Sequence, residues 1–417
     1  MSEETVKRFQ GCECARMMVS APVSALAYVQ SERDVLCEPR RLVVVLSCAF
    51  WQAMRRADQT EPRSHVNVHA CGSTEHPAER LLTYLRERLQ RPAVAYLRPP
   101  VRIAGGFDTH IYAFQLVHVP PAFSGRLIVR IFREPDGSQR ATAEGALQNA
   151  LADAGYLVPR VVDVCTDATV LGGAFILMHC LEGQTLLAAM MRPSMLWRAP
   201  RLLASAHARL HALDPLPILR AVEGAGVPSA LPRIEDVLVR LHEKTQGSGL
   251  ERLLPGFVWL EAHRLPAVGR ASVLHRDFHP GNVLVANGSI TGVIDWPNAG
   301  LGEPAADVAT TRVLLTMGPL HTPTLVRKPI AAIRHWLAWR YSRAYRRIHP
   351  LSDTSLRYYE ALRCYAAMLH VAQRRLAVRA GTILARETYA WSAPEQVAKM
   401  TRHFERMTGV TLILPEP

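Results

Sequence analysis

The spacing of apolar residues changes along the chain, and the change separates a region of short strands from regions of helix. The stretch ERLLTYLRERL at 79–89 places Leu82, Leu85 and Leu89 on one face of a helix, with arginine and glutamate on the opposite face. Prolines at 92, 99 and 100 follow it and exclude a longer helix. The pattern predicts an amphipathic helix that opens a folded region near residue 79.

Short β-rich runs then follow one another up to residue 182. They lie at 101–117, which holds two runs joined by glycines, and at 126–132, 158–165 and 174–181. Between the third and fourth runs, the Ala-rich segment 140–155 ends at Gly155 and predicts a helix. These runs predict a small sheet of about five strands with one long helix inserted after the third.

Helical periodicity dominates from residue 184 onward. The segment LLASAHARLHALD at 202–214 is one clear helix, on which His207 and His211 share a stripe. Because the sequence shows no carboxylate or third ligand near them, we interpret both as packing histidines rather than as a metal pair. Long helices are also predicted between residues 330 and 390.

The first 76 residues differ from the rest, since they show no clear period and hold five of the eight cysteines. We expect an extension of uncertain order at 1–76, a strand-rich part at 77–182 and a mainly helical part at 183–417. Scattered cysteines without a CxxC pair favour a reducing, cytoplasmic location.

Charge narrows the choice of partners only slightly. The formal net charge of +13 favours anionic partners, but the chain has no zinc-finger spacing, RNA-binding signature or basic heptads, so we expect no nucleic acid. No run reaches the roughly 20 apolar residues of a membrane span, so we expect no membrane partner either.

A polar cluster around residue 280 carries the candidate chemistry. HRDFHPGN at 275–282 is followed by VLVA, the turn signal Asn287-Gly288, and SITGVI, which together predict a tight β-hairpin. An antiparallel hairpin brings its two ends together. We therefore expect Asn282, just before the first strand, beside Asp295, just after the second, with Asp277 on the loop that leads in.

Two kinds of chemistry fit this cluster. An amide oxygen on Asn282 and a carboxylate on Asp295 are hard ligands that suit Mg²⁺ beside substrate phosphates, and Asp277 suits the base of a phosphoryl transfer. Alternatively, His275, Asp277 and His279 alternate on one extended segment and resemble the zinc site of a metal-dependent hydrolase. The hydrolase interpretation needs further ligands at matched spacing, and we find no other histidine-rich motif that supplies them.

The motif HRDFHPGNVLV followed by GVIDW resembles the aminoglycoside phosphotransferase and choline kinase group, which has the protein-kinase-like fold. GEPAADVA at 302–309 is also similar to a motif of that group, with Glu303 in place of its first aspartate. The resemblance covers residues from about 80 to the C-terminus, and Arg276 departs from the group's usual glycine. It implies an α+β, bilobal fold. The small β-rich N-lobe at 77–182 would bind the nucleotide, and the large helical C-lobe at 183–417 would hold the catalytic loop and the substrate-binding helices.

The resemblance also implies nucleotide-binding residues in the small lobe. Gly105, Gly106 and Phe107 match the flexible loop over the phosphates. Arg130 stands where the group has its phosphate-binding lysine, and Glu144 matches the partner of that lysine on the long helix.

The segment 174–183 resembles the hinge of the group, which receives the edge of the purine through backbone groups, and this places His179, Cys180 and Leu181 at the nucleotide. With Asp277 and Asn282, we count His275 among the catalytic residues.

The predicted function is transfer of the γ-phosphate of ATP or GTP, with Mg²⁺, to a hydroxyl of a small molecule such as an antibiotic or a metabolite. A non-catalytic, pseudokinase-like nucleotide-binding protein is the alternative. The basic composition of 321–400, with 14 arginines and lysines against four acids, favours a neutral or anionic acceptor over a polycationic aminoglycoside.

Overall fold

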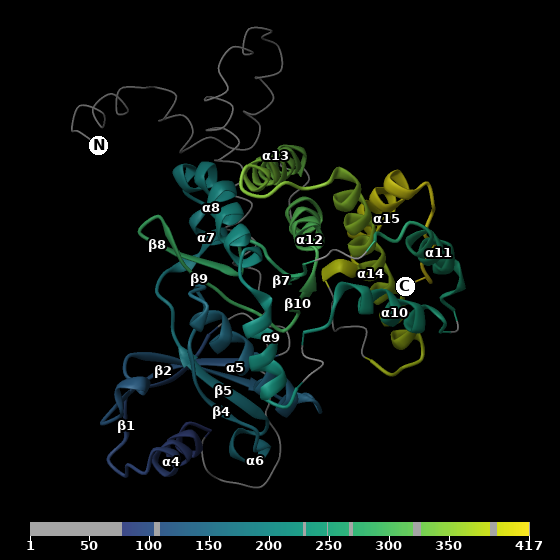
Figure 1. Ribbon diagram of the computed structural model, residues 1–417. Helices are drawn as coiled ribbons and strands as arrows, with labels where there is room; N and C mark the ends of the chain where they lie inside the picture. The colour runs from purple at the N-terminus through teal and green to yellow at the C-terminus, as the bar shows by residue number, and fades with distance from the viewer. Residues whose placement is uncertain are drawn as a thin grey trace, which may run out of the picture. The chain divides into compact units, whose positions relative to one another are not determined.

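The structure is a computed structural model that describes residues 77–103, 109–227, 231–247, 249–266, 270–319, 327–383 and 390–416 (Figure 1). The proposed extension at 1–76 lies outside these residues, so the boundary near 77 stays a prediction, as does the lobe boundary at 182. Within the described residues, no helix is both long and apolar enough to cross a membrane.

The small lobe is built on an antiparallel five-stranded sheet in the order β1-β2-β3-β5-β4. The strands are β1 (Ala95–Arg102), β2 (Thr109–Val117), β3 (Arg126–Phe132), β4 (Val161–Cys165) and β5 (Ala174–His179). Helix α5 (Gly137–Asp153) follows the third strand, as predicted. Short turns of helix, η2 (Pro121–Phe123) and α6 (Ala168–Leu171), complete the connections.

Helices cover both faces of this sheet because successive strand residues point to opposite sides. Helix α4 (Pro77–Leu89) buries Leu81 and Leu85 against one face, where alternate residues of β3 and β5 join the same core. Helix α5 packs on the other face (Figure 1). Arg130, in the middle strand β3, alternates with Val129 and Ile131 and therefore lies on the α5 side.

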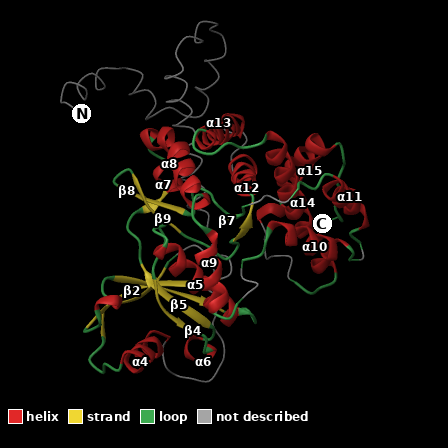
Figure 2. Cartoon of the chain, in the orientation of Figure 1, coloured by secondary structure: helices red, strands yellow, loops and turns green. Residues whose placement is uncertain are grey.

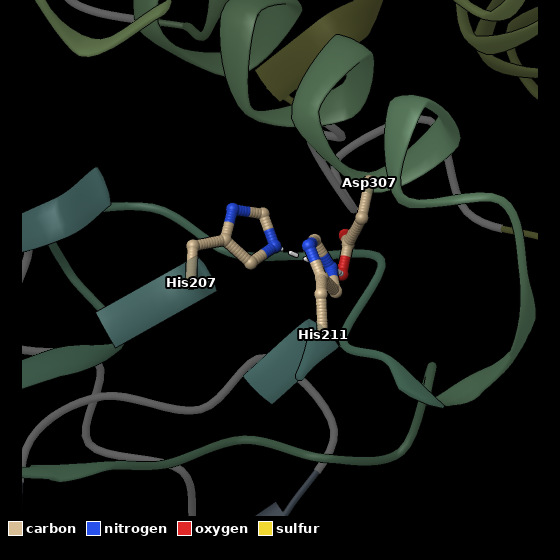
Figure 3. A group of neighbouring side chains, drawn as sticks. All are labelled: His207, His211 and Asp307. Atoms are coloured by element: carbon tan, nitrogen blue, oxygen red, sulfur yellow. Dashed lines mark hydrogen bonds and ion pairs between the residues drawn. The ribbon is translucent and has the colours of Figure 1, made fainter. Parts of the chain in front are cut away.

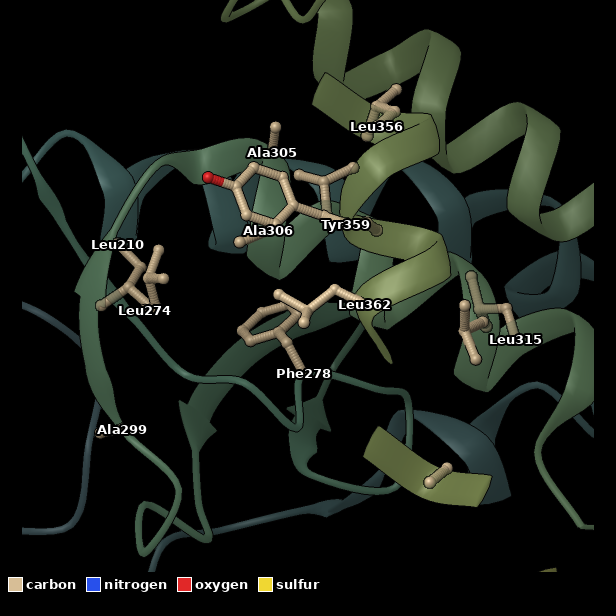
Figure 4. Close-up of a cluster of buried hydrophobic side chains, with 14 of the residues drawn as sticks. Leu210, Leu274, Phe278, Ala299, Ala305, Ala306, Leu315, Leu356, Tyr359 and Leu362 are labelled. Atoms are coloured by element: carbon tan, nitrogen blue, oxygen red, sulfur yellow. The ribbon is translucent and has the colours of Figure 1, made fainter. Parts of the chain in front are cut away.

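The larger lobe is mainly helical (Figure 2). Its helices are α7 (Leu186–Ala189), α8 (Pro193–His211), α9 (Pro215–Gly224), α10 (Ile234–Thr245), η3 (Glu251–Leu253), α11 (Leu254–Ala262), α12 (Pro304–Met317), α13 (Arg327–Arg346), α14 (Asp353–Arg379), η5 (Ala390–Ser392) and α15 (Pro394–Thr408). Helix α12 packs against α13, α14 and the short strand β7 (Ser272–Leu274), so it occupies the middle of this lobe. Figure 4 shows part of the core there, where Phe278 of the loop after β7 lies among residues of α12 and α14.

Two small sheets flank the loop at 275–282. Strand β8 (Val283–Ala286) pairs with β9 (Ser289–Val293) and with β6 (Gln184–Thr185), and β7 pairs with β10 (Gly300–Gly302). Asn287 and Gly288 between β8 and β9 both have left-handed backbones, with φ of 51° and 77°, as the predicted type I′ turn requires. The segment 275–282 is therefore the connection from β7 to this hairpin.

Candidate active site

The ends of the β8–β9 hairpin lie side by side. The backbone N–H of Ile294 donates to the carbonyl of Asn282 at 2.9 Å, so Asn282 and Asp295 follow directly from a paired position. Asp295 has φ of 70°, a left-handed conformation that turns the chain sharply as it leaves the strand. The local sequence thus places an amide and a carboxylate at the same end of one hairpin.

Asp277 is fixed to Asn282 across the turn of the loop. The Nδ2 of Asn282 donates to the carbonyl oxygen of Asp277 at 3.0 Å and lies 3.5 Å from its Oδ2. This orients the buried amide, and its Oδ1 has no hydrogen-bond partner among the described residues. The carboxylate of Asp277 remains about a quarter exposed and is therefore accessible from solvent.

Arg130 joins the small lobe to this site. Its Nη1 donates to Oε1 of Glu144 at 2.8 Å, and its Nη2 donates to Oδ1 of Asp295 at 3.3 Å. The side chain of Arg130 is only 10% exposed, so it is not a solvated strand residue. Gln148 also donates to Glu144 at 3.0 Å and holds that carboxylate in place.

His275 is fully buried and connects the loop to the hairpin. Its Nε2 donates to the carbonyl of Ile294 at 3.0 Å, while Nδ1 accepts from the backbone N–H of Asp277 at 3.3 Å. Burial lowers the pKa of this imidazole, which favours the neutral form. With both ring nitrogens engaged by backbone groups, His275 positions Asp277 and offers no lone pair to a metal.

His279 closes the turn. Its Nδ1 accepts from the backbone N–H of Gly281 at 3.0 Å, and its Nε2 lies 3.9 Å from Oδ2 of Asp277. Burial lowers its pKa as well, ahead of the opposing effect of Asp277. His275, Asp277 and His279 therefore do not converge on a common point as the zinc interpretation requires.

Asp307, at the start of α12, binds the backbone of the loop at 275–282. The sequence did not predict this role. Its Oδ2 accepts from the backbone N–H of His275 at 2.6 Å and its Oδ1 from that of Arg276 at 2.8 Å. Two histidines of α8 also point at it: Nε2 of His207 lies 3.0 Å and Nε2 of His211 3.3 Å from Oδ2 (Figure 3). The His207 contact lies outside good hydrogen-bond geometry, whereas the His211 contact is a hydrogen bond.

The expectation that no carboxylate accompanies His207 and His211 is therefore wrong, because Asp307 comes from a segment 96 positions after His211. The expectation that they are packing residues holds: both are buried, and His207 stacks on Phe278 with ring centroids 3.9 Å apart. An ionised Asp307 only accepts, so each imidazole presents Nε2–H to it and each Nδ1 accepts from a tyrosine hydroxyl of α13 at 2.6 Å. That arrangement leaves no free ring lone pair for a metal.

The hinge follows β5. The backbone N–H groups of His179 and Cys180 already donate to the carbonyls of Arg160 and Arg126 at 2.9 Å, whereas the N–H of Leu181 has no partner among the described residues. Gly183 has φ of 109°, and a Cβ there would lie 2.3 Å from the carbonyl oxygen of Val285, so only glycine lets the hinge pass β8 so closely. Gly105, Gly106 and Phe107 lie outside the described residues.

The small lobe holds a buried ion pair under its sheet, and a hinge joins it to the larger lobe. The larger lobe carries Asp277, Asn282 and Asp295 on a loop and a hairpin. Together these features define a bilobal protein-kinase-like phosphotransferase. The model of the phosphotransferase enzyme family matches residues 101–351, more than half of the chain, and the chain belongs to that family. The chain is therefore a member of a phosphotransferase family, as the sequence resemblance predicted.

Solved structures agree with this fold. A proposed aminoglycoside phosphotransferase from Ralstonia eutropha JMP134 is 17% identical with a TM-score of 0.54, and the match covers 80% of this chain and 99% of that one. A thermostable mutant of aminoglycoside phosphotransferase APH(4)-Ia, in a ternary complex with ADP and hygromycin B, is 15% identical with a TM-score of 0.51, and the match covers 79% and 98%. At these identities the likeness shows the fold alone.

A curated relative is more similar in sequence but much longer. Acyl-CoA dehydrogenase family member 10 of Mus musculus is 26% identical over 194 residues, which is 44% of this chain. The matched segment spans 18% of the mouse protein, so most of that protein has no counterpart in the match.

Proposed function

We propose that the protein transfers the γ-phosphate of ATP or GTP to a hydroxyl group of a small molecule, with Asp277 as the base. The observation that carries the proposal is the convergence of Asp277, Asn282 and Asp295 at one end of the hairpin, with Arg130 reaching them from the nucleotide-binding lobe. Phosphoryl transfer needs little covalent chemistry from the protein. It needs an oriented hydroxyl, an acceptor for its proton and cations for the phosphate charge.

Each residue has a part that its contacts support. The partly exposed carboxylate of Asp277 takes the proton of the acceptor hydroxyl, and His275 and Asn282 hold the backbone of Asp277 in place. Arg130, held by Glu144, faces the phosphates. The N–H of Leu181, which has no partner among the described residues, and the carbonyl groups of His179 and Cys180 receive the purine.

The donor set at the hairpin end fits Mg²⁺. Among the described residues, Oδ1 of Asn282 has no hydrogen-bond partner, and the carboxylate of Asp295 is 40% exposed, so both oxygens are available to a hard cation. When bound there, Mg²⁺ would neutralise charge on the phosphates of the nucleotide. Arg130 touches Oδ1 of Asp295 and would share that carboxylate with the metal.

The two alternatives are separated by different observations. The geometry argues against the metal-dependent hydrolase, since both ring nitrogens of His275 and Nδ1 of His279 are bound to backbone groups. A non-catalytic nucleotide-binding protein would lack an effective base or metal site, whereas Asp277, Asn282 and Asp295 are all in place. The cytoplasmic location suggested by the cysteines stays a prediction.

The proposal is tested by incubating the protein with Mg²⁺, ATP or GTP, and a panel of neutral, cationic and anionic hydroxyl compounds. Mass spectrometry should detect an acceptor that has gained a phosphoryl group, and Asp277→Asn should abolish the product. Asp214→Asn is a matched control. Asp214 caps helix α9, which is distant from Asp277 in sequence, and asparagine caps helices as well as aspartate does. Nucleotide binding without any phosphorylated product across a broad panel would favour the non-catalytic alternative.

A further inference from the structure

A cavity of about 480 Å³ in the larger lobe is bordered by α12, by the second half of α13 and by the start of α14. Four arginines line it, one from α12 and three from the end of α13 and the residue after it: Arg312, Arg343, Arg346 and Arg347. Among the described residues that line the cavity, the acidic one is Asp353, the first residue of α14. The lining therefore holds more positive than negative charge.

Two of these arginines are held in place by carboxylates. Nε of Arg312 donates to Oε1 of Glu360 on α14, and its Nη1 donates to Oγ of Ser342 on α13 at 2.9 Å. Nη2 of Arg346 donates to Oδ1 of Asp353. These contacts join three helices, so both guanidinium groups are oriented before a ligand arrives. Nη2 of Arg312 stays available to a ligand, since it has no hydrogen-bond partner among the described residues.

The other two arginines lack such partners. Arg343 and Arg347 are exposed, and neither forms a hydrogen bond or an ion pair with a described residue. They lie four positions apart at the end of α13, and like charges at that spacing repel each other. The negative end of the helix dipole offsets part of that repulsion. Since the carboxylates of the two ion pairs balance the other arginines, two positive charges remain at the cavity.

An aromatic ring lies beside the two unpaired arginines. Trp339 precedes Arg343 by four positions on α13, so Trp339, Arg343 and Arg347 follow one another along the same side of the helix. Trp339 also lines the cavity, and it is 55% exposed. An exposed indole face packs well against planar or apolar groups. The cavity thus offers unbalanced cations next to a surface for the organic part of a ligand.

We propose that this cavity binds a phosphate monoester of a small molecule, with the phosphate on the arginines and the organic part on Trp339. A phosphate monoester carries a charge of about −1.5 to −2 at neutral pH, which matches two unbalanced cations better than a single carboxylate does. Guanidinium groups also pair with phosphate oxygens through two parallel hydrogen bonds. The cavity volume lies within the roughly 300–1,000 Å³ of small-molecule sites.

The inference is independent of the proposed function. Among the described residues, no residue that lines the cavity is hydrogen-bonded or ion-paired with Asp277, Asn282 or Asp295. Binding can therefore be measured without nucleotide, by titrating the full chain with phenyl phosphate in a calorimeter. Wild type should bind it. Arg343→Gln and Arg347→Gln should each weaken the affinity by about tenfold, since each removes a charged hydrogen-bond donor.

Two further variants separate the phosphate from the ring and from general charge. Trp339→Leu should weaken the binding of phenyl phosphate but leave that of inorganic phosphate unchanged, because inorganic phosphate has no ring to pack. Arg220→Gln is the matched control. Arg220 is also exposed and forms no ion pair with a described residue, but it lies on α9, which packs against α5. It should leave the affinity unchanged, and all three arginine variants should unfold at the wild-type temperature because the side chains they remove are exposed.

A second arm tests a membrane as the source of the phosphate group. An anionic membrane binds arginines that spread over an outer face, whereas these arginines line one hollow. In sedimentation with vesicles of phosphatidylcholine and phosphatidic acid, wild type should therefore bind no better than Arg343→Gln. Sedimentation that depends on Arg343, without binding of phenyl phosphate, would overturn the inference in favour of a lipid surface.

Three other results would also overturn it. The first is a wild type that binds neither phenyl phosphate nor inorganic phosphate. The second is equal binding of phenyl phosphate by Arg343→Gln and Arg220→Gln, which would show that the cavity is not the site. The third is benzoate bound as tightly as phenyl phosphate, because benzoate has the same ring with a single charge. If Trp339→Leu bound phenyl phosphate like wild type, the place assigned to the organic part would be wrong.

Discussion

Replacing Asp307 with asparagine tests whether a buried carboxylate holds the catalytic loop. Asp307 is fully buried and accepts from two backbone N–H groups of the loop, and two imidazoles present Nε2–H to it. Asparagine has nearly the same shape, but one of its two polar atoms becomes a donor and carries two hydrogens. That amide would face groups that are themselves donors, so at least one buried N–H loses its acceptor.

The size of the effect follows from this burial. Removing one partner of a buried charged network typically costs about 3–5 kcal/mol, because the groups left behind cannot reach water. With a urea slope of about 3 kcal/mol per M for a chain of this size, the unfolding midpoint should fall by roughly 1 M or more. Phosphotransfer should fall as well, since the backbone of His275 and Arg276 leads directly into Asp277.

The pH dependence of the free energy of unfolding gives a second test of the network around Asp307. Burial lowers the pKa of His207 to about 4, so between about pH 6.5 and 4 the unfolded chain takes up a proton there and the folded chain does not. Stability is therefore full above pH 6.5 and falls by about 3 kcal/mol as the pH drops to 4. His207 and His211 hold the pKa of Asp307 well below its usual range, so wild type loses further stability below about pH 3.8 as that carboxylate protonates.

The assay is urea unfolding of wild type and Asp307→Asn at a series of pH values from 7 down to 3, monitored by circular dichroism. The variant should lack the additional loss below pH 3.8 that belongs to the carboxylate. Asp214→Asn provides the matched exposed control and should stay within about 0.5 kcal/mol of wild type. A midpoint for Asp307→Asn equal to that of the control at pH 7 would refute the role assigned to this network.

The remaining predictions concern the chemistry and the N-terminal segment. Asp277→Asn should lower turnover about 10²- to 10⁴-fold while nucleotide affinity and unfolding stay unchanged, and a variant that keeps most of its turnover would contradict the assignment. Asp295→Ala should lose Mg²⁺-dependent nucleotide binding in calorimetry without rescue by zinc, whereas stoichiometric zinc lost on His279→Ala would favour the hydrolase. A chain that begins at residue 74 keeps α4, which starts at Pro77, and should unfold cooperatively and transfer phosphate. A much lower thermal midpoint than that of the full chain would show that the first residues contribute to the fold.

The parts of the site that sequence alone could place are those fixed by local structure. The Asn287-Gly288 turn requires left-handed backbones that asparagine and glycine adopt easily, and it pairs Ala286 with Ser289. A shift of one residue at Thr291 then brings Val283 opposite Val293. Once the register is set, Asn282 and Asp295 must lie at the same end. The five-stranded sheet with its inserted helix followed from periodicity for the same reason, except that β1 begins at Ala95, before the predicted run at 101, and passes through Pro99 and Pro100 with shifts in its register to β2.

The support beneath the loop could not be placed in this way. His207 and His211 show only a helical spacing of four, and nothing near them in sequence marks a partner. Asp307 reaches them because α8, α12 and the loop after β7 pack together, which is a tertiary event. The signal was nevertheless present in GEPAADVA, where the second acid of the motif is Asp307. The resemblance pointed to the motif without saying what its carboxylate touches.

The structure changes the interpretation of Arg130, which stands where the family has a lysine. Arginine in place of the family's lysine is a departure that favours a non-catalytic protein when the sequence is considered alone, because a planar fork replaces a point charge. In the structure, one nitrogen of the fork binds Glu144 while the other reaches Asp295, and the side chain is buried under the sheet. A lysine has one nitrogen on a flexible stem and would not bridge the two carboxylates in the same fixed way. The substitution keeps the ion pair and adds a contact to the proposed metal ligand, which favours a working phosphotransferase whose Asp295 is held in place before the nucleotide arrives.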